Sequence, residues 1–158
     1  MPAVPTYDDL AARLEKVSGG DERKLNRLML ACVEQSGLPL PPVAAEASRV
    51  ARRYWEDETA TDADLAAAGT RCVAGADPCR YPGEGNADYE MTRLTLSVTT
   101  PPEPDLYHSE EEVGDCIGWF PQQLGAAARA VGDDRVLGRA LFAVPFLAES
   151  WDVDAAAA

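Results

Sequence analysis

Apolar residues recur with the spacing of an α-helix along most of the chain, and glycine or proline separates one run from the next. The first run predicts a helix over residues 6–17, with Thr6 as its N-cap and Gly19 just beyond its end. Asp21 can cap a second helix, and Gly37 is where a left-handed residue would end it. The apolar stripe of this second helix follows the i, i+3, i+4, i+7 pattern: Leu25, Leu28, Met29, Cys32 and Val33.

Two further helices are predicted in the next part of the chain. The third begins at Pro41 or Pro42, since proline suits a first helical turn, and closes with Trp55. Thr61 is a good N-cap with an acidic residue, Asp64, three positions later, which predicts the start of a fourth helix. The fourth helix carries Leu65, Ala68 and Cys72. Because the connections are short, we expect the second, third and fourth helices to pack antiparallel.

The middle of the chain carries mixed patterns. Gly, Pro, Asp and Asn accumulate over residues 75–86, which predicts a long central loop on the surface. Residues 93–100 alternate apolar and polar positions as a strand would, but no other segment looks like a partner strand. An isolated strand leaves its backbone groups unpaired, so we expect a helix over residues 88–98, ended by the prolines at 101 and 102.

Two helices are expected in the last third. Ser109 and the three glutamates after it form a capping box for a helix to Val131, which Pro121 should kink or divide. A last helix over residues 133–144 should stop at Pro145, with three large apolar residues folding back on the core: Phe146, Leu147 and Trp151. The sequence thus predicts an all-α fold, a single-domain antiparallel helical bundle of about six to seven helices over residues 1–154. Whether the alanines at 155–158 are vector-derived stays open.

Acidic residues dominate the charge of the chain. There are 27 Asp and Glu against 14 Lys and Arg, a net charge of -13 with a sequence pI of about 4.4. Such a surface repels phosphate backbones and anionic lipids, so we expect no direct nucleic-acid partner and no membrane. Without a leader peptide or a long apolar run, a cytoplasmic location is expected. The simpler interpretation of the acidity is solubility.

Residue types that carry catalysis are sparse. His108 is the single histidine and stands between a proline-rich segment and a helix start, where we expect an exposed loop residue. The four cysteines match no common metal-ligand spacing; Cys32, Cys72 and Cys116 fall on apolar stripes, and a bridge between Cys72 and Cys79 stays open. The acidic groups lack the glycine-containing loop of an EF-hand. The sequence therefore predicts no catalytic residue, no metal site and no cofactor, in a protein that is not an enzyme.

Two acidic groups at helix starts are the best candidates for a recognition surface. Both have aromatic neighbours, and interfaces favour aromatic anchors beside charge. The candidate partner-binding residues are Tyr54, Trp55, Glu56, Asp57, Glu58, Asp62, Asp64, Glu110, Glu111, Glu112, Asp115 and Trp119. The alternative interpretation is that the acids complement the helix dipoles and the aromatics belong to the core.

Three segments together resemble the helical immunity proteins of bacterial toxin systems, the Imm5-like group: residues 21–32 (DERKLNRLMLAC), 47–55 (ASRVARRYW) and 59–65 (TATDADL). Residues 139–146 (RALFAVPF) are similar to the aromatic-proline segment that closes such domains. The resemblance implies stoichiometric neutralisation of a cognate protein toxin with a basic surface. A phage-type acidic inhibitor or nucleic-acid mimic is the alternative, and a metal-dependent enzyme is the least favoured; the oligomeric state stays open.

Overall fold

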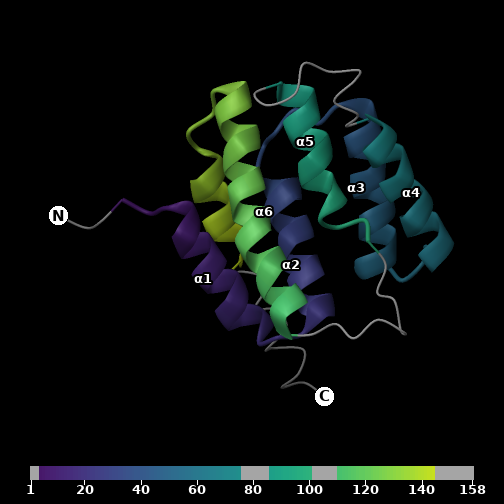
Figure 1. The fold of residues 1–158 in the computed structure, drawn as a ribbon, viewed down its shortest axis with the longest axis horizontal. Coiled ribbons are helices and arrows are strands. Elements are labelled where there is room, and N and C mark those ends of the chain that lie inside the picture. The colour runs from purple at the N-terminus through teal and green to yellow at the C-terminus, as the bar shows by residue number, and fades with distance from the viewer. Residues whose placement is uncertain (1–3, 76–85, 101–109, 145–158) are drawn as a thin grey trace.

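The described part of the chain is built from helices. The structure, a computed structural model, describes residues 4–75, 86–100 and 110–144, with the backbone alone over 110–116. In chain order the labelled helices are α1 (Tyr7–Ser18), α2 (Glu22–Gln35), α3 (Pro42–Trp55), α4 (Asp62–Gly75), α5 (Ala87–Leu96) and α6 (Glu110–Val131) (Figure 1). A further helical stretch covers residues 136–144. The predicted all-α bundle is confirmed.

Local side-chain chemistry sets the ends of the first helices as predicted. The Thr6 backbone N–H donates to Asp9 Oδ2 at 2.6 Å, which is one half of a capping box. Asp21 Oδ1 accepts from the Lys24 backbone N–H at 3.1 Å at the start of α2. Between the two helices Gly19 adopts a φ of 58°, the left-handed conformation that lets the chain leave α1.

The segment that looked partly like a strand is the helix α5. The Asn86 side chain caps it by accepting from the Tyr89 backbone N–H at 3.1 Å. Met91 and Leu94 are fully buried on its inner side, so tertiary packing supports a helix of only 10 residues. The expectation of a helix in place of an unpartnered strand is confirmed.

Pro121 lies inside α6, which continues from Glu110 to Val131 as one helix. Of the two expected effects of this proline, division of the helix is therefore wrong, and a kink stays a prediction. A proline in a helix interior costs about 3 kcal/mol. Phe120 and Leu124 on either side of it are completely buried, and each such side chain contributes about 1.5–3 kcal/mol on burial, enough to offset that cost.

Successive helices run in alternating directions, so α2, α4 and α6 all begin at the lower end of the bundle in Figure 1. The helix α2 packs against α1, α3 and α6 and occupies the middle of the fold. Acidic residues are common at helix starts because they complement the positive end of the helix dipole. The up-and-down topology therefore gathers the acidic starts of three helices at one end.

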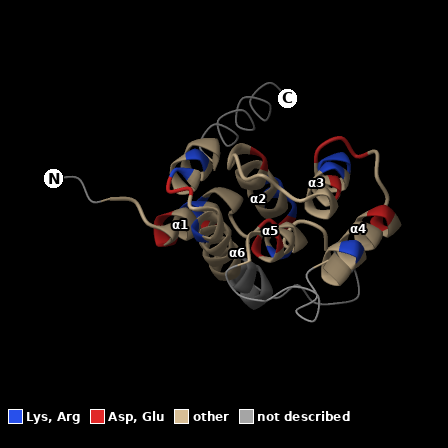
Figure 2. Cartoon of the chain, turned by 90° about the horizontal axis from the view of Figure 1, so that it is seen from above, with Lys and Arg blue, Asp and Glu red and all other residues tan. Residues whose placement is uncertain are grey.

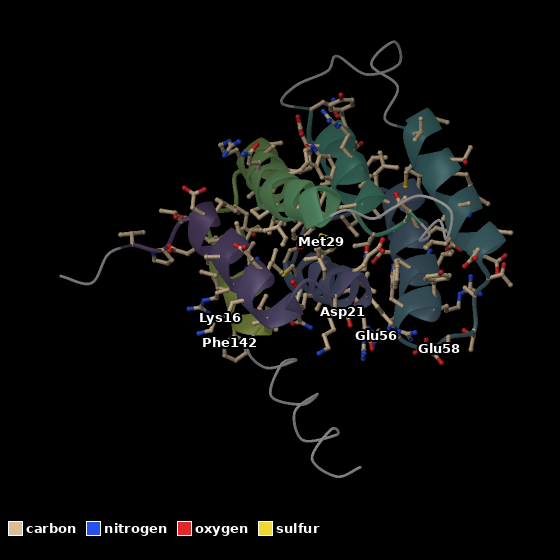
Figure 3. All side chains as sticks on the ribbon, turned by 60° about the horizontal axis from the view of Figure 1, so that its bottom comes forward. Lys16, Asp21, Met29, Glu56, Glu58 and Phe142 are labelled. Carbon is tan, nitrogen blue, oxygen red and sulfur yellow. The ribbon has the colours of Figure 1, made fainter. Side chains whose placement is uncertain are left out.

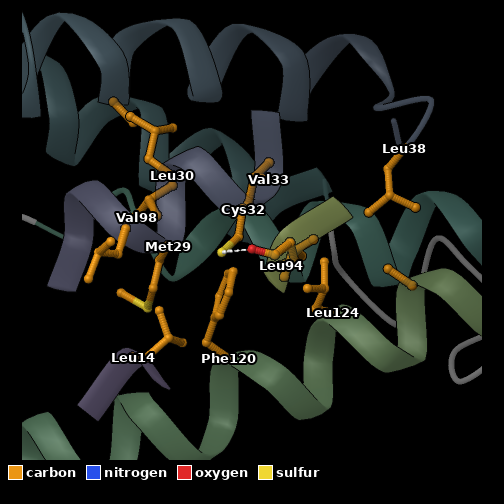
Figure 4. Close-up of a cluster of buried hydrophobic side chains, with 14 of the residues drawn as sticks. Leu14, Met29, Leu30, Cys32, Val33, Leu38, Leu94, Val98, Phe120 and Leu124 are labelled. Atoms are coloured by element: carbon orange, nitrogen blue, oxygen red, sulfur yellow. Dashed lines mark hydrogen bonds between the residues drawn. The ribbon is translucent and has the colours of Figure 1, made fainter. Parts of the chain in front are cut away.

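The core lies between these helices, and Figure 4 shows one part of it. Met29, Phe120 and Leu124 are almost completely buried there. The Cys32 thiol donates to the Ala140 carbonyl oxygen at 3.8 Å, which ties α2 to the 136–144 helix. Cys32 and Cys72 are both buried, as predicted, and both are free in the structure. Burial raises the pKa of the Cys32 thiol to about 12.

Several predictions concern parts outside the described residues. They are the central loop with Cys79, the single His108, the Ser109 cap, the side chain of Cys116, the apolar residues Phe146, Leu147 and Trp151, and the alanine tail over 155–158. No helix within the described ranges combines the length and the apolar character that a bilayer crossing requires.

Candidate protein-binding surface

Five of the predicted carboxylates lie where the chain passes from α3 into α4. We call this group the acidic corner: Glu56, Asp57, Glu58, Asp62 and Asp64. The connection between the two helices and the start of α4 stand out as acidic in Figure 2. Glu56 is partly buried and the other four are exposed, so the corner presents its charge to solvent.

The start of α4 has a capping box that fixes one of these acids. The Asp64 backbone N–H donates to Thr61 Oγ1 at 3.1 Å, and the Thr61 backbone N–H donates to Asp64 Oδ2 at 2.9 Å. Hydrogen bonds from the backbone and side chain of Thr61 hold the pKa of Asp64 below its usual value. The carboxylate is therefore charged at neutral pH and held in a set position.

Two arginines of α2 bind the connection between α3 and α4. Arg27 donates from Nε and from one terminal nitrogen to the two carboxylate oxygens of Glu56, at 3.0 and 2.9 Å. Arg23 forms an ion pair with Glu58 and also donates to the Trp55 carbonyl oxygen at 3.4 Å. Part of the acidic charge is therefore neutralised within the molecule, and the corner is held against α2 as a defined shape.

The backbone turns sharply at Glu58. This residue has a φ of 57°, the left-handed region that favours glycine, although it is a glutamate. The next two backbone N–H groups, of Thr59 and Ala60, donate to the Arg53 carbonyl oxygen at 2.8 and 3.3 Å and end α3. The side chain of Glu58 is 66% exposed, so the turn presents a carboxylate at the tip of the corner.

The two aromatic residues of the corner have different environments. Trp55 is 3% exposed and its Nε1 donates to the Val98 carbonyl oxygen at 2.8 Å, so the structure puts it in the core beneath the corner. Tyr54 is partly buried and meets Trp55 edge to face, with 4.7 Å between ring centroids. The Tyr54 hydroxyl donates to Asp62 Oδ1 at 2.7 Å; burial, and then that carboxylate, raise the pKa of Tyr54 to about 12. Of the two, only Tyr54 reaches the surface.

The second predicted group lies at the start of α6, where the backbone alone is described: Glu110, Glu111, Glu112 and Asp115. Since α4 and α6 begin at the same end of the bundle, both acidic groups belong to that end (Figure 1). Trp119, further along α6, is partly buried beside α5, with the Arg93 guanidinium 5.9 Å from its ring centroid. It packs as part of the contact between α5 and α6.

Sequence reasoning missed Phe142. This side chain is 79% exposed, and in Figure 3 it lies along the same edge of the view as Glu56 and Glu58. It borders a pocket of about 380 Å³ together with Ala31, Glu34, Gln35, Arg52, Glu56 and Ala143. A signal for it was present, because position 142 falls off the buried stripe formed by Val136, Ala140 and Val144. A single exposed aromatic residue does not mark an interaction surface by itself, but this one borders a pocket that also holds carboxylates.

The net charge is not confined to the acidic groups at helix starts. Seven of the 27 acidic residues and one of the 14 basic residues lie in segments 1–3, 76–85, 101–109 and 145–158. These segments therefore contribute -6 of the net -13, and the acidity extends over the whole chain. A partner would meet a negative field well before it reached the corner.

No protein-family model, no curated protein and no solved structure matches this chain. Within the residues that the structure describes, no three His, Cys, Asp or Glu side chains come together as a set that could hold a metal ion.

Proposed function

We propose that this protein is a cytoplasmic immunity protein, which neutralises a cognate bacterial toxin with a basic surface by stoichiometric binding and has no catalytic role. The observation that carries the proposal is the acidic corner, where Asp57, Glu58 and Asp62 are exposed and the surrounding backbone is held by hydrogen bonds. Carboxylates held in place before binding lose little conformational freedom when a partner pairs with them.

The overall charge supports the same function. A net charge of -13 raises the rate of encounter with a basic protein, while the close contacts at the corner set how long the complex lasts. The resemblance of the second, third and fourth helical segments to helical immunity proteins supports it as well. Binding in this way would occlude the active-site or substrate-binding surface of the toxin.

Co-expression with the product of the neighbouring reading frame tests the proposal. We expect the chain to form a complex of fixed stoichiometry with that product and to restore growth of cells that express it. The variant Asp57→Lys, which removes an exposed acid of the corner, should weaken the complex about tenfold, as for a residue near an interface centre.

Asp88→Lys is the matched control, because it makes the same change of charge on an exposed residue of α5, at the other end of the bundle. The complex of this variant should have the same dissociation rate as the complex of the unchanged protein. Its association rate should be slightly lower. Equal weakening by both substitutions would show that net charge alone drives binding and would contradict a role for the corner. Absence of any complex or growth rescue would overturn the function itself.

A further inference from the structure

The pocket beside Phe142 combines apolar, acidic and other polar walls. Ala31, Ala143 and Phe142 supply apolar surface, and Glu34 of α2 and Glu56 after α3 supply carboxylates. Arg52 and Gln35 also border it, and Arg52 is already paired with Glu34. The pocket volume of about 380 Å³ falls in the range of pockets that bind small ligands or single side chains. The α2, α3 and 136–144 helices all contribute to it, so its shape depends on packing within the core.

Both carboxylates have acceptor capacity left. Arg52 donates to the two oxygens of Glu34 at 2.8 and 3.0 Å, and Arg27 donates to the two oxygens of Glu56 at 3.0 and 2.9 Å. Each carboxylate oxygen can accept about two hydrogen bonds, and each of these four accepts one from its arginine. The pocket can therefore satisfy a planar cation with several donors.

The electrostatics of the pocket favour such a cation. Burial raises the pKa of Glu34 in spite of its ion pair with Arg52, and the nearby charges of Glu56 and Asp57 raise it further. Burial therefore outweighs the stabilisation that Arg52 gives to the ionised form of this carboxylate. A second positive group in the pocket would stabilise the ionised form of Glu34.

We propose that this pocket receives one arginine side chain of the basic partner, with the guanidinium paired to Glu34 and Glu56 and its apolar stem packed on Phe142. The inference rests on the proposed function and names the chemistry that the partner must present. Arginine fits better than lysine because its planar group pairs with carboxylates through two hydrogen bonds and also stacks on an aromatic ring. This contact would explain why the Phe142 side chain is 79% exposed.

The test uses N-acetylarginine amide as the probe, titrated into the isotope-labelled full chain and followed by amide NMR shifts. Saturable shifts are expected around Ala31, Glu34 and Phe142. The citrulline analogue has nearly the same shape and no charge, and it should cause no saturable shift. Glu34→Gln and Phe142→Ala should each weaken arginine binding at least fivefold.

Glu46→Gln is the matched control, since Glu46 also pairs with an arginine, Arg49 at 2.7 Å, but does not border the pocket. It should leave the titration unchanged, and urea unfolding of each variant checks that the fold is retained. Equal shifts with citrulline, or loss of binding in Glu46→Gln to the same degree, would overturn the inference. A pocket that binds the probe in a chain that neutralises no toxin would instead count against the proposed function alone.

Discussion

The indole N–H of Trp55 donates to the backbone carbonyl oxygen of Val98 at 2.8 Å, joining the end of α3 to the turn after α5. Both residues are buried, at 3% and 0% exposure. The bond satisfies a carbonyl that water cannot reach, and it anchors the last residue of α3 before the chain enters the acidic corner. The position of the exposed carboxylates therefore depends on a contact in the core.

Trp55→Phe removes this donor and leaves the Val98 carbonyl oxygen buried without it. An unsatisfied buried acceptor costs about 1–3 kcal/mol, so the free energy of unfolding should fall by at least that much. Urea unfolding followed by circular dichroism measures the loss. Tyr54→Phe is the companion variant, because it removes a hydroxyl that donates to the exposed Asp62. Water can replace this donor, so the fall in the free energy of unfolding should be clearly smaller. Equal losses would argue against the anchoring role of the indole.

Gly69 of α4 lies against the turn that follows α5. A Cβ at this position would come within 2.9 Å of the Thr99 backbone carbonyl oxygen, which cannot move aside as a flexible side chain could. We expect Gly69→Ala to destabilise the protein by about 1–3 kcal/mol, as overpacking usually does. Gly118→Ala in α6, where an added Cβ meets no described atom within 4 Å apart from the chain beside it, should stabilise it by about 1 kcal/mol through helix propensity. Thermal unfolding of both variants tests the pair, and a shift of the same sign in both would contradict the packing argument.

Helix boundaries were predictable because each one is set by residues adjacent in the chain. Thr6, Asp21 and Thr61 all act as the caps that their side chains predict. The burial of Trp55 was not predicted in the same way. This tryptophan lies four residues after Ala51, on the same buried stripe, yet the acidic neighbours made it look like an interface residue.

Contacts between helices were beyond sequence reasoning. The pairing of Arg27 with Glu56 joins residues 29 positions apart, and it depends on how far α2 and α3 are shifted along each other. The same holds for the pocket beside Phe142, since three helices must pack before its walls exist. The passage of α6 through Pro121 also depends on burial of its neighbours, which a local rule about proline does not include.

Substitutions of Glu58 can separate the strain of its left-handed backbone from the contribution of its carboxylate. A left-handed residue other than glycine costs about 1–2 kcal/mol, whereas a half-exposed ion pair such as that of Glu58 with Arg23 contributes at most about 1 kcal/mol. The Glu58→Gly variant should therefore be more stable than the natural protein by about 0.5–1 kcal/mol. Glu58→Ala loses the ion pair and keeps the strained turn, so it should be less stable. If the two variants unfold at the same urea concentration, the turn stores no strain. Weaker partner binding by the more stable glycine variant would identify the carboxylate as functional.

Alkaline conditions should destabilise the fold, because three buried or partly buried acids ionise more readily in the unfolded chain. The pKa rises from 9.0 to about 12 for Cys32, from 9.0 to about 11 for Cys72 and from 10.0 to about 12 for Tyr54, with burial as the largest cause in each case. The contribution of these three groups to the free energy of unfolding is fully present at pH values below their pKa in the unfolded chain. It is lost as the pH rises from about 9 towards 12.

Cys32→Ala tests the largest of these contributions. A single group that is ionised only in the unfolded chain lowers the free energy of unfolding by about 1.4 kcal/mol per pH unit. Without the thiol, the free energy of unfolding should fall less steeply between pH 9 and 11, by about that amount per pH unit. The loss of core packing lowers stability at every pH and so does not change this slope. Urea unfolding under reducing conditions at pH 7, 9, 10 and 11 measures both slopes. Identical slopes in the natural protein and the variant would mean that the Cys32 thiol meets water in the folded state, in conflict with its position against Ala140.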